Sequence, residues 1–243
     1  MVPALEAILA KSKNLVFFGG AGVSTESGIP DFRSVDGLYH QKFRYPPEVM
    51  LSHSFYESHT AEFFDFYRNK LIVHGAKPNA AHLRLAQLEQ QGICKAVVTQ
   101  NIEGLHQAAG SHTVYELHGS TLRNYCTRCG KFYPVEFIEQ AAEQGDGIPR
   151  CTECGGIVKP DVVLYEEGLD EQTMENAIRA IAAADTLIVG GTSLAVYPAA
   201  GLLRYFRGDE LVVINKQPTP ADSMATLVLN QPIGEALSLQ AAE

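Results

Sequence analysis

The sequence predicts an α/β fold in which a doubly wound parallel sheet carries a small inserted module. Its short β-branched runs are apolar on consecutive residues, as in strands that are buried on both faces of a sheet. Helical patterns lie between these runs, and this alternation is typical of a parallel sheet covered by helices. Two stretches, at 31–75 and 119–159, interrupt the alternation and are expected to form separate parts of the structure.

Seven runs are expected as strands because each is short, apolar and rich in β-branched residues. In chain order they are Leu15–Phe18, Lys95–Thr99, Val114–Leu117, Val162–Leu164, Thr186–Gly190, Leu211–Ile214 and Thr226–Leu229. The expected helices are Asn79–Leu88, Asp170–Ala183 and Pro198–Phe206, the last with proline in a first-turn position. The stretch 31–75 contains many aromatic residues and no clear strand, so we expect a partly helical insertion there.

The composition limits the classes of function. With 243 residues, the chain is long enough for one large domain or two modest ones. Lys and Arg number 19 and Asp and Glu 28, so the formal net charge is 19 − 28 = −9, and direct nucleic-acid binding is not expected. No apolar run approaches the roughly 20 residues that span a bilayer. The N-terminal segment has no basic region and includes Glu6, so we expect a cytoplasmic location and no membrane partner.

Four cysteines within 119–159 form two pairs with the spacing of metal ligands. Two residues separate Cys126 from Cys129 and Cys151 from Cys154, and 21 residues lie between the pairs. Four thiolates match a closed tetrahedral zinc site with a structural role. Two disulfides are the alternative, although a reducing compartment favours metal binding. The fifth cysteine, Cys94, precedes an apolar strand and is expected to be a small buried residue.

A glycine-rich turn follows the first expected strand. Leu15–Phe18 runs into Gly19-Gly20-Ala21-Gly22, and such a turn can bring backbone amides close to a phosphate group. Thr25 stands where a dinucleotide-binding pattern would have its third glycine, and no acidic residue ends a strand about 20 residues on. A tight turn without a ligand is therefore the alternative. If a dinucleotide binds, the strand-end residues that could hold its second ribose are Thr192, Ser193 and Asn215.

Further polar residues follow two other expected strands. Gln100-Asn101-Ile102-Glu103 comes directly after Lys95–Thr99, and His118 comes after Val114–Leu117. Because the unperturbed pKa of histidine is about 6.5, His118 could act as a general base near neutral pH. A capped, hydrogen-bonded histidine without a catalytic role explains the local sequence equally well.

Taken together, these motifs resemble the sirtuin family of NAD-dependent protein lysine deacylases, in its bacterial form. The matching segments occur in family order and cover about residues 15–237; they are Gly20–Ser24, Ser27–Arg33, Gln100–Glu103, His118-Gly119, the cysteine pairs, Gly191–Leu194, Val196–Ala200 and Ile214-Asn215. The resemblance implies a Rossmann-like NAD-binding domain (1–30, 76–118 and 160–243), a helical insertion with a cofactor-binding loop (31–75), a zinc-binding module (119–159) and a substrate cleft.

The resemblance also implies roles for individual residues. His118 would be the general base, and Asn101 would act with it in catalysis. Contacts with NAD would come from Ala21, Thr25, Phe32, Arg33, Gln100, Ile102, Glu103, His118, Thr192, Ser193, Asn215 and Ile233. The substrate peptide would be added as a strand along Val162, Val163 and Leu164 and beside Val196.

The activity implied by the resemblance is removal of acetyl groups from protein lysine side chains, with nicotinamide and O-acetyl-ADP-ribose as products. The partners would be acetyl-lysine proteins or peptides, and we expect a monomer. Protein mono-ADP-ribosylation and removal of longer acyl chains are alternatives on the same fold. A zinc-containing NAD dehydrogenase and a non-catalytic zinc-ribbon module are alternatives from other classes.

Three features depart from the family pattern. Glu103 stands where the family usually has Asp, and Tyr165-Glu166-Glu167 replaces the usual Phe-Gly-Glu. The added charge at Glu166 could favour basic peptides. The nearest equivalents of the Tyr and Arg that bind succinyl groups in the desuccinylase branch are Phe64 and Tyr67, so acetyl groups are the expected substrate.

Overall fold

Two sheets organise the chain in the computed structural model, which describes residues 2–31, 44–143 and 145–238. The larger sheet has six strands in the order β3-β2-β1-β7-β8-β9, and every neighbouring pair is parallel. Its strands are β1 (Leu15–Gly19), β2 (Cys94–Thr99), β3 (Val114–Glu116), β7 (Thr186–Gly190), β8 (Glu210–Ile214) and β9 (Leu227–Leu229). This strand order reverses beside β1, as in doubly wound nucleotide-binding folds. The fold class predicted from the sequence is confirmed.

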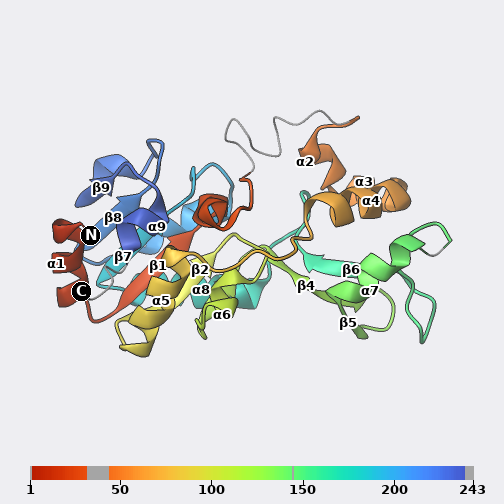
Figure 1. Cartoon of the computed structure of the whole chain (residues 1–243), viewed down its shortest axis with the longest axis horizontal. Helices are drawn as coiled ribbons and strands as arrows, with labels where there is room; N and C mark the ends of the chain where they lie inside the picture. The colour runs from red at the N-terminus through yellow and green to blue at the C-terminus, as the bar shows by residue number, and fades with distance from the viewer. Residues whose placement is uncertain (1, 32–43, 144, 239–243) are drawn as a thin grey trace.

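Helices cover both faces of this sheet (Figure 1). Phe17, Ile188 and Val212 point to one face and pack against α1 (Pro3–Lys11), α5 (Ala80–Gln90) and α9 (Ile233–Leu237). Val16, Val189 and other residues of the opposite face pack against α8 (Glu171–Ala183) and the 3₁₀ helix η5 (Ala199–Tyr205). All five residues of β1 and of β7 are buried, which explains their unbroken apolar sequences.

The starts of two expected helices are confirmed by their caps. The Asn79 side chain accepts a hydrogen bond from the Ala81 amide and caps α5, and Asp170 accepts one from the Thr173 amide at the start of α8. The segment expected as a helix at Pro198–Phe206 is the tighter η5. Gly201 in its centre weakens the preference for a regular α-helix.

The second sheet is antiparallel, with strand order β5-β4-β6. It consists of β4 (Gly119–Cys126), β5 (Phe132–Pro134) and β6 (Val158–Val162), with α7 (Val135–Gln140) beside it. The prediction of a strand at Val162–Leu164 is therefore wrong in its bounds: β6 ends at Val162. Val162 pairs with Gly119 of β4, so pairing with a distant part of the chain determines where β6 ends.

Helices α2 (Pro47–Met50), α3 (His53–Ser58) and α4 (Thr60–Lys70) form the described part of the insertion. Their aromatic side chains, among them Phe63 and Tyr67, share one hydrophobic core with Ile138 and Val158 of the antiparallel sheet region. We call α2–α4, α7 and the antiparallel sheet the small lobe, and the parallel sheet with its helices the large lobe.

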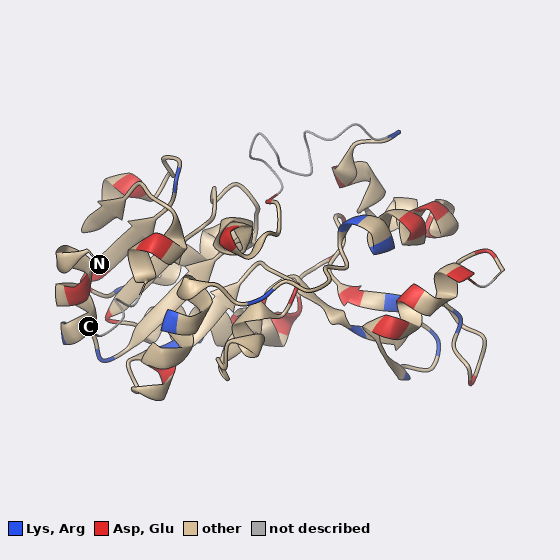
Figure 2. Cartoon of the chain, viewed as in Figure 1, with Lys and Arg blue, Asp and Glu red and all other residues tan. Residues whose placement is uncertain are grey.

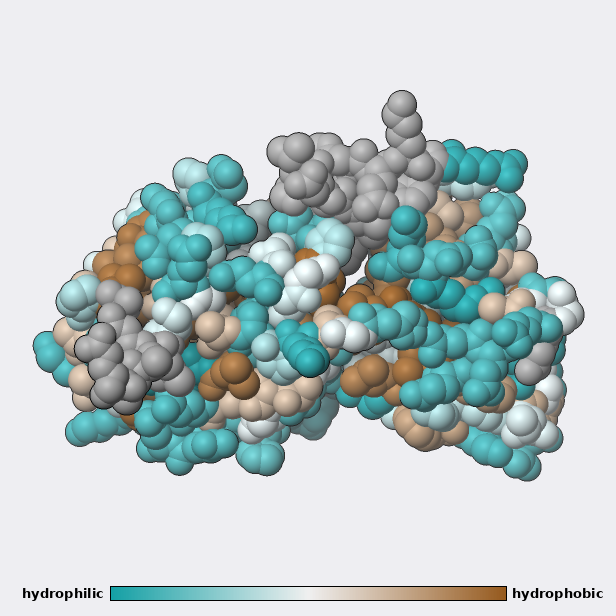
Figure 3. Space-filling model, viewed as in Figure 1, coloured by the Kyte–Doolittle hydropathy of each residue, from teal (hydrophilic) through white to brown (hydrophobic). Residues whose placement is uncertain are grey.

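The two lobes lie side by side and are joined by crossing segments (Figure 1), and the surface is hollowed between them with hydrophobic side chains on its walls (Figure 3). Lys and Arg are scattered over both lobes (Figure 2).

None of the described helices has the length and apolar character needed to cross a membrane. The other short helices in the described ranges are η1 (Ala21–Val23), η2 (Thr25–Ser27), α6 (Leu105–Ala108), η4 (Ala141–Glu143) and η6 (Asp222–Met224).

Candidate active site

The carboxyl ends of the central strands meet at one edge of the large sheet. The Gln100 amide donates to the carbonyl oxygen of Gly19 at 3.0 Å, and the Gln100 side chain donates to Thr192 Oγ1 at 3.1 Å. The Gly191 amide donates to the Ile214 carbonyl at 3.1 Å. These bonds join the segments that follow β1, β2 and β7 to the end of β8, which is where open α/β sheets bind their ligands.

The glycine turn after β1 packs tightly against the segment after β7. The Gly22 amide donates to the Gly191 carbonyl at 2.8 Å. A Cβ atom at Gly20 would lie 2.9 Å from Thr192 Cβ, and one at Gly22 would lie 2.8 Å from the Gly191 oxygen. This close approach alone requires glycine at both positions. The two sequence-predicted residues of the turn are Ala21, half-buried at the start of η1, and Thr25, whose hydroxyl donates to the Gly22 carbonyl at 3.0 Å.

A cluster of three polar side chains lies next to this turn. Ser24 donates to Glu103 Oε1 in a short hydrogen bond, and the Asn101 side chain donates to Ser24 Oγ at 3.0 Å and to Glu103 Oε1 at 3.1 Å. Ser24 and Asn101 are both buried. Sequence reasoning proposed Asn101 and Glu103 but missed Ser24, whose only signal was its place in the glycine-turn motif.

The loop that carries Asn101 is fixed from both lobes. The carbonyl oxygen of Ile102 accepts hydrogen bonds from the amide and the hydroxyl of Thr121 in β4, at 2.9 and 3.2 Å. The Ile102 amide donates to Glu103 Oε2 at 3.1 Å. The longer glutamate side chain at 103 thus makes hydrogen bonds with both its oxygens, to a backbone amide and to the Ser24–Asn101 pair.

His118 lies between this loop and residues 162–164, the segment expected to bind the peptide. Its Nδ1 is 3.0 Å from the Gln100 carbonyl oxygen, and its own carbonyl accepts from the Val163 amide at 3.0 Å. Because a carbonyl oxygen only accepts, Nδ1 carries a hydrogen and Nε2 keeps its lone pair in the neutral ring. Burial lowers the pKa of His118, although the bond to Gln100 opposes that shift. The ring is therefore neutral and suited to accept a proton near pH 7.

The residues expected around the second ribose are spread along the same sheet edge. Thr192 is buried against Gln100, and Ser193 is exposed. Asn215 follows β8, and its side-chain amide donates to the Gln217 carbonyl at 2.7 Å. Ile233 is buried, and its side chain packs over Gly190. Phe32 and Arg33 lie outside the residues that the structure describes.

The expected peptide-binding segment lies at the junction of the lobes. Val162 and Leu164 have buried side chains, and Val163 is half-buried. Val196 is half-buried and lies in the large lobe, between β7 and η5. The Tyr165 amide donates to the Leu51 carbonyl at 3.0 Å, so the segment after β6 also contacts the helical insertion.

The four paired cysteines form a metal-binding cluster. The Sγ atoms of Cys126, Cys129, Cys151 and Cys154 all lie within 4.8 Å of one another, with 3.4 Å between Cys126 and Cys154 and 3.6 Å between Cys129 and Cys151. Zinc–sulfur bonds of about 2.3 Å in a tetrahedron place sulfurs roughly 3.8 Å apart, so the cluster fits zinc. All five cysteines are free, which excludes the disulfide alternative, and Cys94 is buried apart from the cluster as predicted.

Backbone amides and one hydroxyl point at the sulfurs. The Arg128 amide donates to Cys126 Sγ at 3.4 Å, and the Glu153 amide donates to Cys151 Sγ at 3.4 Å. Tyr133 donates its hydroxyl hydrogen to Cys151 Sγ at 3.2 Å. Such donors stabilise thiolates and orient them toward a cation. With four sulfur ligands, the ion would have no open position for a substrate, which fits a structural role.

Comparison with known proteins identifies the family. The model of the Sir2 family matches residues 20–198, which include the glycine turn, the Asn101 loop, His118 and the four cysteines. The chain belongs to the Sir2 family. A curated relative of this Sir2-family chain is the "NAD-dependent protein deacetylase" of Clostridium acetobutylicum, 61% identical over 96% of this chain and 95% of the relative. A protein of the same name from Staphylococcus epidermidis is 44% identical, over 94% of this chain and 92% of its own length.

Solved structures of Sir2 proteins have the same fold. A structure described as "Sir2-p53 peptide-NAD+" matches with a TM-score of 0.86 and 40% identity, over 98% of this Sir2-family chain and 95% of the other. A complex of Sir2 with an inhibitor, 2′-O-acetyl-ADP-ribose and a deacetylated p53 peptide matches with a TM-score of 0.83 and 38% identity, over 97% and 96% of the two chains.

Proposed function

We propose that this chain is an NAD-dependent protein-lysine deacetylase. One acetyl-lysine, one NAD and one water would give lysine, nicotinamide and O-acetyl-ADP-ribose, and no hydride would be transferred. The observation that carries the proposal is the position of His118. Its ring contacts Gln100 at the sheet edge, and its carbonyl contacts Val163 of the peptide-binding segment, so one residue joins both proposed substrate sites.

His118 acts as the general base. The acetyl oxygen of the substrate lysine attacks C1′ of the ribose as nicotinamide leaves. Nε2 of His118 then removes a proton from a ribose hydroxyl, whose oxygen attacks the acyl carbon. The neutral tautomer fixed by Gln100 presents the lone pair that this step needs.

The Ser24–Asn101–Glu103 cluster, in which Ser24 and Asn101 are buried, forms the nicotinamide side of the site. A water-excluding pocket favours departure of nicotinamide toward the acyl oxygen over hydrolysis. Asn101 acts with His118 in catalysis, and its side chain is held by Ser24 and Glu103. We assign the NAD contacts to Ala21, Thr25, Phe32, Arg33, Gln100, Ile102, Glu103, His118, Thr192, Ser193, Asn215 and Ile233.

The substrate peptide pairs as an added strand with the backbone of Val162, Val163 and Leu164, beside Val196. Main-chain pairing of this kind gives affinity with little dependence on peptide sequence. The zinc site maintains the antiparallel sheet that carries this segment, because Cys126 and Cys151 belong to the core of the small lobe. Cysteines that bind zinc have to stay reduced, as they do in a reducing compartment, so we propose that the protein works in the cytoplasm.

Acetyl groups are the proposed substrates over succinyl groups. Phe64 and Tyr67, the nearest equivalents of the Tyr and Arg of desuccinylases, are fully buried and carry no positive charge. Neither side chain therefore offers a positive charge to pair with a carboxylate on the acyl chain.

Mass spectrometry of an acetyl-lysine peptide incubated with the protein, with and without NAD, tests the proposal. We expect NAD-dependent loss of the acetyl group together with nicotinamide and O-acetyl-ADP-ribose. A matched succinyl-lysine peptide should react more slowly. A dehydrogenase would instead change the absorbance of the nicotinamide ring, and an ADP-ribosyltransferase would add label from NAD to the acceptor protein; either result without deacetylation would contradict the proposal.

A further inference from the structure

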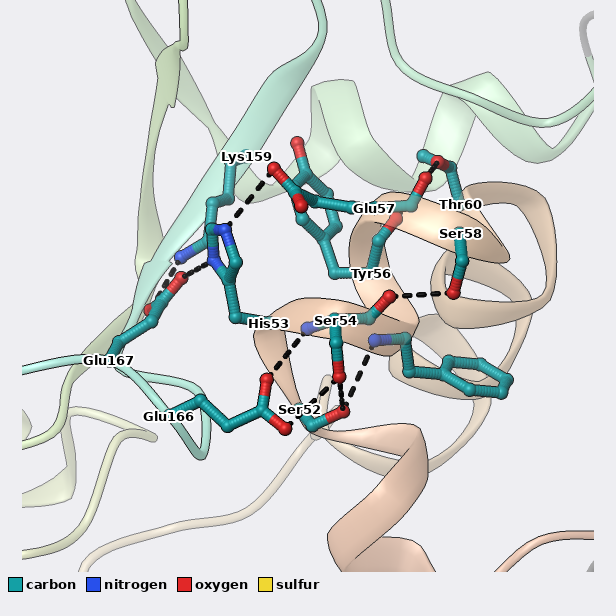
Figure 4. Close-up of polar contacts among 11 residues, drawn as sticks. Ser52, His53, Ser54, Tyr56, Glu57, Ser58, Thr60, Lys159, Glu166 and Glu167 are labelled. Atoms are coloured by element: carbon teal, nitrogen blue, oxygen red, sulfur yellow. Dashed lines mark hydrogen bonds and ion pairs between the residues drawn. The ribbon is translucent and has the colours of Figure 1, made fainter.

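Two consecutive glutamates connect the segment after β6 to the start of α3 (Figure 4). Glu166 accepts hydrogen bonds from the Ser54 amide at 2.9 Å and from the Ser54 hydroxyl at 3.0 Å. Glu167 Oε1 lies 2.8 Å from His53 Nδ1. The other oxygen of Glu167 accepts from the Lys159 ammonium at 3.1 Å and from the Leu164 amide at 2.9 Å.

Backbone hydrogen bonds join the same two segments. The Tyr165 amide donates to the Leu51 carbonyl and the His53 amide to the Tyr165 carbonyl, both at 3.0 Å. On its other edge, the segment is bonded to His118 through the Val163 amide. The position of the proposed peptide strand relative to His118 therefore depends on how firmly the segment is attached to α3.

The backbone at Glu166 is unusual for a residue with a side chain. Its φ is +76°, in the left-handed region that favours glycine. A conformation of this kind persists only where surrounding contacts compensate for its cost. The two hydrogen bonds from Ser54 are the described contacts that hold the Glu166 side chain, so the carboxylate is directed at α3.

The Glu167 side chain also has several partners in this chain. Burial works to raise its pKa, but the Leu164 amide, His53 and Lys159 together bring the pKa below its ordinary value. The hydrogen bond that His53 donates to Glu167 raises the pKa of His53 in turn, with a smaller contribution from Glu57. Glu167 therefore interacts as a carboxylate with groups of this chain.

We propose that Glu166 and Glu167, with His53 and Ser54, form a clasp that holds residues 162–165 ready to pair with the substrate peptide, and that Glu166 is a positioning residue for peptide binding. The proposal rests on the proposed deacetylase function. A strand edge that is ordered before binding loses less conformational entropy when a peptide pairs with it. Loosening the clasp should thus weaken peptide binding and leave the NAD side of the site unaffected.

Steady-state kinetics of Glu166→Gly, Glu166→Gln and Glu57→Gln test the clasp. Glu166→Gly removes the side chain and suits the positive φ, so the variant should fold. We expect its KM for an acetyl-lysine peptide to rise about tenfold, because hydrogen bonds to a charged group are lost. The kcat and the KM for NAD should stay within about twofold of the wild-type values. Glu166→Gln keeps an acceptor for Ser54 and should restore most of the peptide affinity. Glu57 lies 3.3 Å from His53 Nε2, and Glu57→Gln leaves every hydrogen bond of Glu166 and Glu167 in place, so this variant should behave like the wild type.

Three results would overturn the proposal. An unchanged peptide KM in Glu166→Gly would show that the clasp does not position the peptide. Equal losses in Glu166→Gly and Glu166→Gln, confined to basic peptides, would show that the Glu166 charge recognises substrate directly. A fall in kcat together with a raised KM for NAD would indicate general damage.

Hydrogen exchange measured on the protein without substrates separates this proposal from the proposed function. The clasp predicts faster exchange at 53–58 and 163–167 in Glu166→Gly, with no change elsewhere in the described chain. If the wild type deacetylates no peptide, the proposed function fails, and unchanged exchange in these two segments would independently refute the clasp.

Discussion

The imidazole of His118 is oriented by the backbone of Gln100, whose carbonyl oxygen lies 3.0 Å from Nδ1. Gln100 is itself fixed at the sheet edge by two hydrogen bonds. Its backbone amide donates to the Gly19 carbonyl, and its side chain donates to Thr192 Oγ1. The strand ends of the large lobe thus determine which nitrogen of His118 is free to accept a proton. This relationship explains how the proposed base, two residues after β3, can have its tautomer set without an acidic partner.

The pH dependence of kcat/KM should reflect this environment. Burial lowers the pKa of His118, and a general base is active only when unprotonated. We expect activity to fall on the acid side with a midpoint below about 6.5, the ordinary histidine value. Kinetics from pH 5 to 8 measure the midpoint, and a midpoint clearly above that value would contradict the assignment.

Replacement of His118 by alanine should abolish acyl transfer while the fold is retained. Loss of a general base lowers turnover by about 10²–10⁴-fold. Thermal unfolding and zinc content should match those of the wild type, because His118 lies outside the cysteine cluster. The exposed His112, replaced by glutamine, is the matched control and should leave turnover unchanged. A His118→Ala variant with more than a tenth of wild-type turnover would exclude His118 as the base.

Gly119 should tolerate no side chain. Its φ is +75°, and a Cβ atom there would overlap the carbonyl oxygen of Asp161 in the paired strand β6. We expect Gly119→Ala to lower the free energy of unfolding by more than about 3 kcal/mol, since strain and steric overlap combine. Gly28 also has a positive φ but nothing within 4 Å of the added atom, so Gly28→Ala should cost only about 1 kcal/mol. Urea denaturation measures both, and equal losses would contradict the structural explanation.

The cysteine cluster should bind one zinc ion per chain. Metal analysis of purified Cys151→Ser should show loss of zinc and of activity, because Cys151 is both a ligand and part of the small-lobe core. Cys94→Ala is the matched control, since Cys94 is a buried cysteine outside the cluster. Full zinc content and full activity in Cys151→Ser would rule out the four-thiolate site.

Acid should destabilise the large lobe through a buried histidine pair. Burial lowers the pKa of His82 to about 4 and that of His106 to about 3, and their ring centroids are 4.7 Å apart. The unfolded chain binds protons at these residues below about pH 6.5 and the folded chain does not, so stability falls as the pH drops from 6.5 toward 4. The expected loss by pH 5 is about 2 kcal/mol for each histidine.

Urea unfolding of His106→Phe at pH 7 and pH 5 isolates this effect. Both ring nitrogens of His106 lack a hydrogen-bond partner among the described residues, so the phenyl ring removes a titrating group without breaking a hydrogen bond. The acid-induced loss should be smaller than that of the wild type by about 2 kcal/mol, the contribution of His106. His112→Gln should lose as much stability between pH 7 and pH 5 as the wild type does. A wild-type loss in His106→Phe would contradict the explanation.

The features that could be predicted from the sequence are those encoded locally. Consecutive apolar residues predict the buried strands, and the spacing of the cysteines predicts the metal cluster. The bounds of β6 could not be predicted, because they depend on pairing with Gly119 across some forty residues of intervening chain. The Ser24–Glu103 bond and the Glu166–Ser54 contact likewise join residues that only the folded chain brings together.

The most direct test of the central claim is a crystal structure of this chain with NAD and an acetyl-lysine peptide. We expect His118 Nε2 within hydrogen-bonding distance of a ribose hydroxyl, and the peptide paired with the backbone of 162–164. A bound complex in which the imidazole faces away from the ribose, or in which the acetyl-lysine does not reach it, would contradict the account.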